Sequence, residues 1–157
     1  MNEKALRILE YDKIINMLAG FAVSPMAKEM AYHLQPSVSM SEIVLRQQET
    51  TEAVSMVLRK GSPSFGGFRE IRPQLKRAEM GGTLSIPELM HIGEFLYVCR
   101  KAKNYAKNEN KAEAYERLDE YFELLTLIPN LENEITRCIV SETEIADDAS
   151  SVSYTHL

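Results

Sequence analysis

The chain has 157 residues, of which 45% are hydrophobic and 26% charged, and its 18 basic and 23 acidic side chains give a formal net charge of −5. This composition is typical of one globular domain or one compact piece of a larger protein. It excludes collagen-like, low-complexity and highly charged disordered chains, and the net negative charge argues against a protein that coats nucleic acid with its whole surface.

No apolar run approaches the ~18–20 residues that cross a bilayer. The first four residues, MNEK, are not followed by the apolar core of a signal peptide. We therefore expect no membrane partner and a cytoplasmic location. Cys99 and Cys138 are the only cysteines, and we interpret both as free thiols, because disulfide scaffolds are smaller and rich in cysteine.

The first predicted helices lie between residues 12 and 34. Asp12 opens a segment with one apolar face, Ile14, Ile15, Leu18, Phe21 and Ala22. Ser24 is a good N-cap, and Pro25 suits the first position of a helix because that position needs no backbone donor. This second helix is predicted to end near Leu34, ahead of Pro36.

The next predicted helix starts at a capping box, Ser39 with Glu42. It ends at Arg59-Lys60-Gly61, where cations in the last turn precede a glycine that can adopt positive φ. The positions expected to be buried are Ile43, Leu45, Ala53, Val54, Val57 and Leu58.

A turn-rich loop over residues 61–67 separates this helix from a shorter one. Pro73 indicates that the shorter helix starts near Arg72 or kinks, and glycines 81 and 82 end it. Ser85 and Glu88 form a second capping box, which starts the longest helix. The expected buried face of that helix is Leu89, Ile92, Phe95, Leu96, Cys99 and Ala102.

The last predicted helices cover about residues 112–125 and the stretch after Pro129. The first carries Tyr115, Leu118, Phe122 and Leu125 inward, and the second Leu131, Ile135 and Cys138. Residues 139–151 are too short and acidic to assign, and no run alternates like a half-buried strand. The fold class is therefore all-α, an antiparallel helical bundle, because the connections are short.

Known catalytic motifs are mostly absent from the sequence. Residues 61–66 have the first spacing of a phosphate-binding P-loop, but Gly67 and Phe68 stand where lysine and a hydroxyl are needed. No His-Glu-x-x-His or Cys-x-x-Cys pattern is present. A metal cluster at Glu142, Glu144, Asp147 and Asp148 is an unspecific possibility, and a small metal-dependent hydrolase is a third, weaker reading of the chain.

The feature that most clearly indicates a binding function is a basic stretch in the middle of the chain. Six basic residues and one acid, Glu70, lie between Arg59 and Arg77, whereas residues 109–148 contain twelve acids and three bases. Residues three or four apart share a helical face, so a basic face beside a glycine-rich loop can hold phosphates. The candidate nucleic-acid contacts are Arg69, Arg72, Lys76 and Arg77. The alternative is an ordinary surface that pairs with the acidic third.

Several separated blocks resemble the endonuclease MutS-two family, the bacterial MutS paralogues. They are LEYDKIINMLA at 9–19, AVSPMAKE at 22–29, GSPSFGGFREIRPQLKRAEMGGTLS at 61–85, IPNLENEITRCI at 128–139 and IADDASS at 145–151. The resemblance implies that residues 1–151 are the N-terminal portion of a MutS-type helical core domain. Residues 152–157, VSYTHL, resemble a non-native tail and are excluded from the fold prediction.

The resemblance implies a longer parent with an ATPase domain that uses ATP and magnesium and an Smr nuclease domain. Such proteins are homodimers that bind branched DNA and restrain recombination, and some bind and split stalled ribosomes. They lack the mismatch-reading domain of MutS proper. None of the family's catalytic motifs falls within this chain, so we expect a non-enzymatic scaffold segment without catalytic, cofactor or metal residues. Its partners would be the rest of the parent chain, DNA and ribosomal RNA.

The main alternative is a stand-alone helical protein-interaction module, whose acidic C-terminal third binds a basic partner. If the chain is instead part of a larger core, helix faces meant for later segments should be apolar and uncovered. The candidates are the long helix around Tyr97 and the last helix around Leu131 and Ile135.

Overall fold

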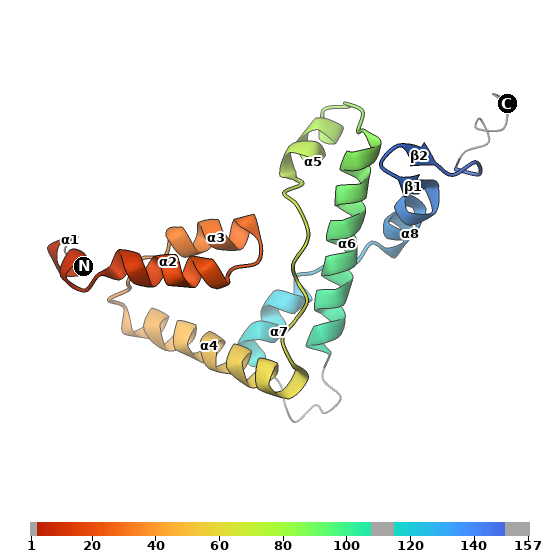
Figure 1. Ribbon diagram of the computed structural model, residues 1–157. Helices are drawn as coiled ribbons and strands as arrows, with labels where there is room; N and C mark the ends of the chain where they lie inside the picture. The colour runs from red at the N-terminus through yellow and green to blue at the C-terminus, as the bar shows by residue number, and fades with distance from the viewer. Residues whose placement is uncertain (1–2, 108–114, 150–157) are drawn as a thin grey trace. The chain divides into compact units, whose positions relative to one another are not determined.

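The computed structural model describes residues 3–107 and 115–149, which form eight α-helices and one short β-hairpin (Figure 1). The all-α prediction is confirmed. The predicted tail at 152–157 lies outside the described residues. The elements are α1 Glu3–Ile8, α2 Tyr11–Phe21, α3 Pro25–Tyr32, α4 Met40–Lys60, α5 Arg72–Glu79, α6 Ile86–Ala106, α7 Glu116–Glu123, α8 Pro129–Cys138, β1 Ile139–Ser141 and β2 Glu144–Ile145.

The chain divides into two compact units. Unit 1 comprises Met1–Gly67 with Ala102–Leu125, and unit 2 comprises Phe68–Lys101 with Thr126–Leu157. Helix α6 therefore contributes residues to both units. None of the helices in the described ranges is long and apolar enough to cross a membrane.

In unit 1, α2 and α3 form an antiparallel pair (Figure 1). The predicted cap forms, because the Ser24 hydroxyl accepts a hydrogen bond from the Ala27 backbone N–H at 3.1 Å. The buried residues of the two helices have small or branched side chains, Ile15 and Ala19 on α2 and Ala31 on α3. Small side chains allow the two helices to approach closely.

Helix α4 begins after Ser39 and ends before Gly61, as predicted, but its predicted N-terminal capping bond is not formed. Gly61 has φ 78°, and its N–H donates to the Val57 carbonyl at 2.9 Å. Ser39 precedes the helix, yet its side chain makes no capping bond, so the predicted capping box with Glu42 is wrong. The Glu42 carboxylate instead accepts from the Ser37 hydroxyl and pairs with Arg46 one turn later, since both groups lie within its reach.

Charged side chains close the ends of helices in unit 1. The Glu52 carboxylate on α4 accepts from the backbone N–H groups of Arg117 and Leu118 at 3.0 and 3.1 Å, and so caps the N-terminus of α7. The Lys60 ammonium donates to the carbonyls of Tyr105 and Lys107 at 2.8 and 3.0 Å at the end of α6. These bonds use helix termini as attachment points, because each terminus has unpaired backbone groups.

Unit 2 has a small core of branched residues. Ile71, Ile92 and Ile135 are buried together, and the partly buried side chains around them are Leu84, Phe95, Leu96 and Ile139. Helix α8 approaches α6 closely at Gly93, where an added Cβ would lie 3.0 Å from Ile135 Cγ2. The predicted buried positions Ile92 and Ile135 are confirmed.

The segment after α8, which the sequence left unassigned, contains the hairpin. Ile139 pairs with Ile145 in an antiparallel register between β1 and β2. The Ala146 N–H donates to the Cys138 carbonyl at 2.9 Å, so the return strand is fixed to the end of α8. Three- and two-residue strands are too short to leave an alternating pattern in the sequence.

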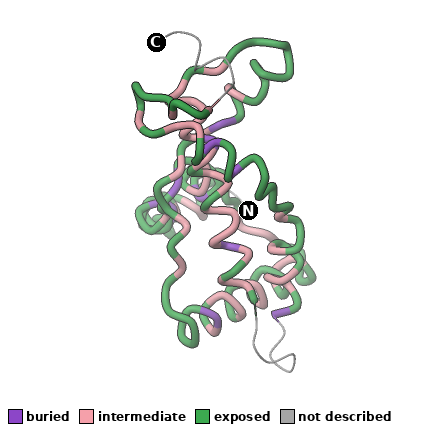
Figure 2. The backbone as a smooth tube through the Cα atoms, turned by 90° about the vertical axis from the view of Figure 1, so that its right-hand side faces the viewer, coloured by how far each residue is buried: buried purple, intermediate pink, exposed green. Residues whose placement is uncertain are grey.

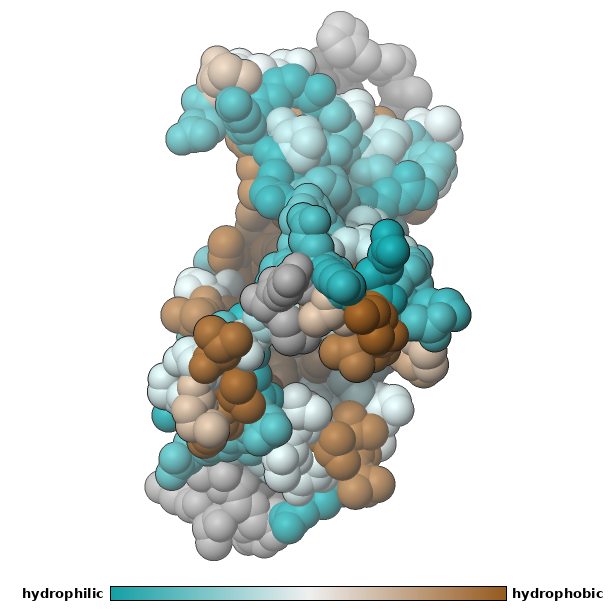
Figure 3. Space-filling model, turned by 90° about the vertical axis from the view of Figure 1, so that its left-hand side faces the viewer, coloured by the Kyte–Doolittle hydropathy of each residue, from teal (hydrophilic) through white to brown (hydrophobic). Residues whose placement is uncertain are grey.

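Burial is shallow over the described residues. None of their large side chains is more than 98% buried, and Figure 2 shows the buried positions as short, separated segments. Several positions that periodicity places inside are exposed, including Ile14 at 55%, Phe21 at 82% and Leu58 at 80%. Figure 3 shows hydrophobic side chains gathered in patches on one face. These helices thus carry more apolar surface than their own contacts cover.

Candidate nucleic-acid interface

The four predicted contact residues lie on α5 and the segment that leads into it, all within unit 2. Ile71 is buried immediately before the helix and holds its start against the small core. Pro73 lies in the first turn, and Gly81 with φ 80° follows the last turn. This eight-residue helix presents its basic side chains to solvent.

Arg72 is paired with a carboxylate two residues earlier. Its Nε and a terminal nitrogen donate to the two Glu70 oxygens at 2.9 and 2.5 Å, and its backbone N–H donates to Glu70 Oε1 at 3.0 Å. The side-chain hydrogen bonds from Arg72 are the largest cause that lowers the pKa of Glu70 to about 2. Arg72 therefore stabilises the ionised form of Glu70 relative to the protonated form.

Arg77 is paired with Glu88 at the start of α6. Glu88 also accepts from the Ser85 N–H and hydroxyl, both at 2.8 Å, so the carboxylate half of the predicted second capping box is confirmed. The Ser85 N–H, followed by Arg77, lowers the pKa of Glu88 to about 2. A Cβ at Gly82 would lie 2.6 Å from Arg77 Cγ, so only glycine lets the chain turn back here.

Arg69 and Lys76 are exposed, and the described residues place no carboxylate within ion-pair distance of either side chain. Lys76 follows Arg72 by one turn, which separates them by ~6 Å along the helix axis. We call the surface formed by Arg69, Arg72, Lys76 and Arg77 the α5 basic surface. Arg72 and Arg77 have carboxylate partners close by, whereas Arg69 and Lys76 have none among the described residues. Among the described residues, Glu70 pairs with Arg72 and Glu88 with Arg77.

Sequence reasoning missed the ion pairs that Glu70 forms with Arg72 and Glu88 with Arg77. For Glu70 the available signal was its position two residues before Arg72, at the start of a proline-marked helix. The other two basic residues of the stretch, Arg59 and Lys60, end α4 in unit 1. The Lys60 ammonium donates to the Tyr105 carbonyl at 2.8 Å and so closes the end of α6.

The aromatic residues near the basic stretch are internal anchors. Phe65 packs edge-on against Tyr105 and Phe122, with ring centroids 5.5 and 6.3 Å away. Phe68 packs against Phe95 at 5.4 Å. In the loop Gly61–Gly67, Pro63 lacks the backbone donor that a phosphate would use, and the Gly61 carbonyl accepts from the Tyr105 hydroxyl at 2.7 Å.

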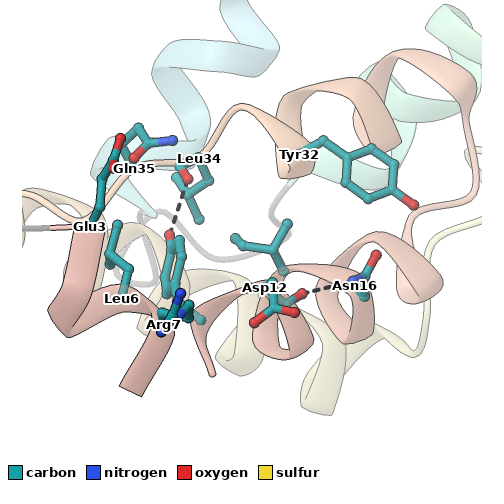
Figure 4. Close-up of a pocket in the computed structure, with 10 residues that line it drawn as sticks. Glu3, Leu6, Arg7, Asp12, Asn16, Tyr32, Leu34 and Gln35 are labelled. Atoms are coloured by element: carbon teal, nitrogen blue, oxygen red, sulfur yellow. Dashed lines mark hydrogen bonds between the residues drawn. The ribbon is translucent and has the colours of Figure 1, made fainter. Parts of the chain in front are cut away.

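A hollow of about 470 Å³ lies away from α5, between α1, α2 and the segment after α3 (Figure 4). Its polar groups are mixed in charge, with Glu3, Arg7 and Asp12, and the Tyr11 hydroxyl donates to the Leu34 carbonyl at 3.1 Å. No set of three or more His, Cys, Asp or Glu suited to a metal occurs within 3–107 and 115–149.

The pKa of Glu88 leads to a prediction for stability. Because this pKa is lowered in the folded chain, the unfolded chain binds the proton first, and stability falls as pH drops from about 4.5 toward about 2. We expect Glu88→Gln to make unfolding by urea less dependent on pH within this window. Glu94→Gln, an exposed change on the same helix, is the control, and equal pH dependence in both variants would contradict the assignment.

Comparison with known proteins gives consistent similarities. The chain is 46% identical over 155 residues to an endonuclease MutS2 of Lachnoclostridium phytofermentans, covering 96% of this chain and 20% of that protein. It is 38% identical over 154 residues to an endonuclease MutS2 of Clostridium perfringens, covering 98% of this chain and 20% of that protein. It is 39% identical over 151 residues to one of Acetivibrio thermocellus, covering 96% of this chain and 19% of that protein. No family model matches the chain. The chain thus spans about one fifth of the length of these relatives.

Proposed function

Because this chain belongs to the endonuclease MutS2 family, we propose that it is a non-catalytic helical scaffold segment of a protein that acts on nucleic acid. Within that role, the α5 basic surface contacts the phosphate backbone of DNA or RNA. The observation that carries this proposal is the pairing pattern of the four cations, since Arg69 and Lys76 are exposed without a carboxylate partner among the described residues.

The uncovered apolar faces support a scaffold role. Large hydrophobic side chains are exposed on α2, α3 and α4 of unit 1, among them Met17, Met30 and Val54. In unit 2, Tyr97 and Leu131 are 47% and 43% exposed, as expected for faces that later segments cover. Ile135 is the exception, because it is already buried against α6. The relatives are about five times as long as this chain, so they contain further segments that can cover such apolar faces.

The other properties that the family resemblance implies are proposed for the parent protein. ATP and magnesium would bind, and strand cleavage would occur, at residues outside this chain. The same holds for homodimer formation, for branched DNA as a substrate and for the splitting of stalled ribosomes. We propose that the present segment supports and orients those parts.

The alternative, a stand-alone module whose acidic third binds a basic partner, has less support. Several acids of that third are already engaged within the chain. Glu132 pairs with Arg100 at 2.9 Å, and Glu134 and Asp148 pair with Arg137 at 2.9 and 3.4 Å. These carboxylates fix helices rather than form an unpaired acidic face.

A salt titration tests the proposal. Binding of a fluorescently labelled DNA duplex to the chain should weaken steeply with salt, because each phosphate contact releases counterions. Lys76→Ala should reduce the logarithmic salt slope by about 0.9. Lys28→Ala removes the same charge from an exposed position on α3 and should leave the slope unchanged. Equal slopes for the two variants would refute the phosphate contact.

A further inference from the structure

The carboxylate of Glu70 occupies an anion position at the N-terminus of α5. Three donors converge on it, the backbone N–H, Nε and a terminal nitrogen of Arg72, at 3.0, 2.9 and 2.5 Å. The N-terminal end of a helix is also its positive end. Backbone N–H groups combined with an arginine fork are the donors that a phosphate oxygen uses.

A phosphate that reaches Arg72 must therefore displace a carboxylate that is already bound. The pKa of Glu70 is lowered to about 2 because Arg72 stabilises the ionised carboxylate, which a phosphate would have to replace. A single phosphate that displaces Glu70 only replaces one anion at Arg72 by another, so the net gain in binding free energy is small. A polyanion that is already anchored at Arg69 and Lys76 presents its next phosphate at high effective concentration, because the exchange is then intramolecular.

We propose that Glu70 is a specificity-determining residue of the α5 basic surface, which holds chains of linked phosphates and rejects single phosphates because Glu70 competes for Arg72. This inference rests on the proposed function and adds the residue by which the surface would discriminate a chain of linked phosphates from a mononucleotide or free phosphate.

A phosphate would displace Glu88 from Arg77 less easily than it would displace Glu70 from Arg72. Its side chain is 22% exposed, against 34% for Glu70, and its partner Arg77 is 45% exposed, against 68% for Arg72. Glu88 also accepts from the Ser85 N–H and so stabilises the start of α6. Displacement of Glu88 would leave that helix end uncapped, whereas displacement of Glu70 leaves the Arg72 N–H to the incoming phosphate.

The test compares Glu70→Gln with Glu79→Gln in the whole chain. Both changes remove one negative charge near α5, but Glu79 is an exposed residue at the other end of the helix and has no ion pair with a described residue. Glutamine at position 70 retains an oxygen for the Arg72 N–H, and circular dichroism checks that helicity is unchanged. The probes are a labelled 20-nucleotide DNA strand and, as competitor, inorganic phosphate.

We expect Glu70→Gln to bind the labelled strand about threefold to fivefold more tightly, a factor typical of an exposed ion pair. Its logarithmic salt slope should change little, because the strand contacts Arg72 in both chains and only the competition from Glu70 is removed. Inorganic phosphate should compete measurably with the strand only in this variant. Glu79→Gln should change affinity less than about twofold, because distant exposed charges are screened.

Three results would overturn the inference. Equal gains for Glu70→Gln and Glu79→Gln would show an effect of net charge alone, and the proposed function would stand. A gain that survives Arg72→Ala in the Glu70→Gln background would place the competition elsewhere. Absence of salt-dependent binding in both the unsubstituted chain and Glu70→Gln would refute the proposed function together with this inference.

Discussion

Reversing the charges of Arg72 and Lys76 together, by Arg72→Glu and Lys76→Glu, is expected to weaken duplex DNA binding at least about tenfold near ~0.1 M salt. Two phosphate contacts disappear, and each contributes about 0.9 to the logarithmic salt slope. The slope should therefore fall by about 1.8. Fluorescence anisotropy over a range of salt concentrations measures both quantities.

A matched control separates local contact from net charge. Lys13→Glu with Lys28→Glu makes the same charge change in unit 1. Lys13 has a local carboxylate partner, Glu10 at 2.6 Å, as Arg72 has Glu70, and Lys28 is exposed, as Lys76 is. If the control pair reduces affinity as much as the α5 pair, the interaction is a diffuse charge effect and α5 is not the interface.

The second large effect concerns the core of unit 2. Ile92→Ala removes a side chain that is 7% exposed and packs with Ile71 and Ile135. Burial of this kind is worth about 2–4 kcal/mol on truncation. Because small units are only marginally stable, we expect the free energy of unfolding of unit 2 to fall by most of its value, measured by urea unfolding with circular dichroism and hydrogen exchange.

The control for this prediction is Ile128→Ala, which truncates an isoleucine that is 49% exposed just before α8. It should cost well under about 1 kcal/mol, as surface changes usually do. Similar losses for the two variants would mean that the Ile71, Ile92 and Ile135 cluster does not hold unit 2 together.

The contacts around α5 also explain how one surface can combine structural and binding roles. Arg77 and Glu88 connect the end of α5 to the start of α6, so this pair positions the surface. In the proposed role, Arg69 and Lys76 contact the ligand directly, whereas Arg72 does so only when it is released from Glu70. We expect such a surface to bind weakly at any one point and to gain affinity from several linked contacts.

The helical class and the ends of several helices were readable from the sequence, because caps and breakers act over a few residues. Ser24, Gly61 and Glu88 do in the structure what their local chemistry predicts. Ser39 does not, since the choice between two serines for one carboxylate depends on the path of the chain before α4. The hairpin after α8 was missed because strands of two or three residues carry no period.

Which apolar faces are buried was decided only by the tertiary structure. Periodicity marks Ile14 and Ile92 equally as inward-facing, yet the first is 55% exposed and the second 7%. A helix pattern states only that one face needs a partner, and whether that partner is present depends on other segments. In the same way, the sequence placed four cations on or beside one short helix, while the structure decided that Glu70 and Glu88 pair with two of them. Charge is a local property of residues, whereas pairing depends on where the backbone brings the opposite charge.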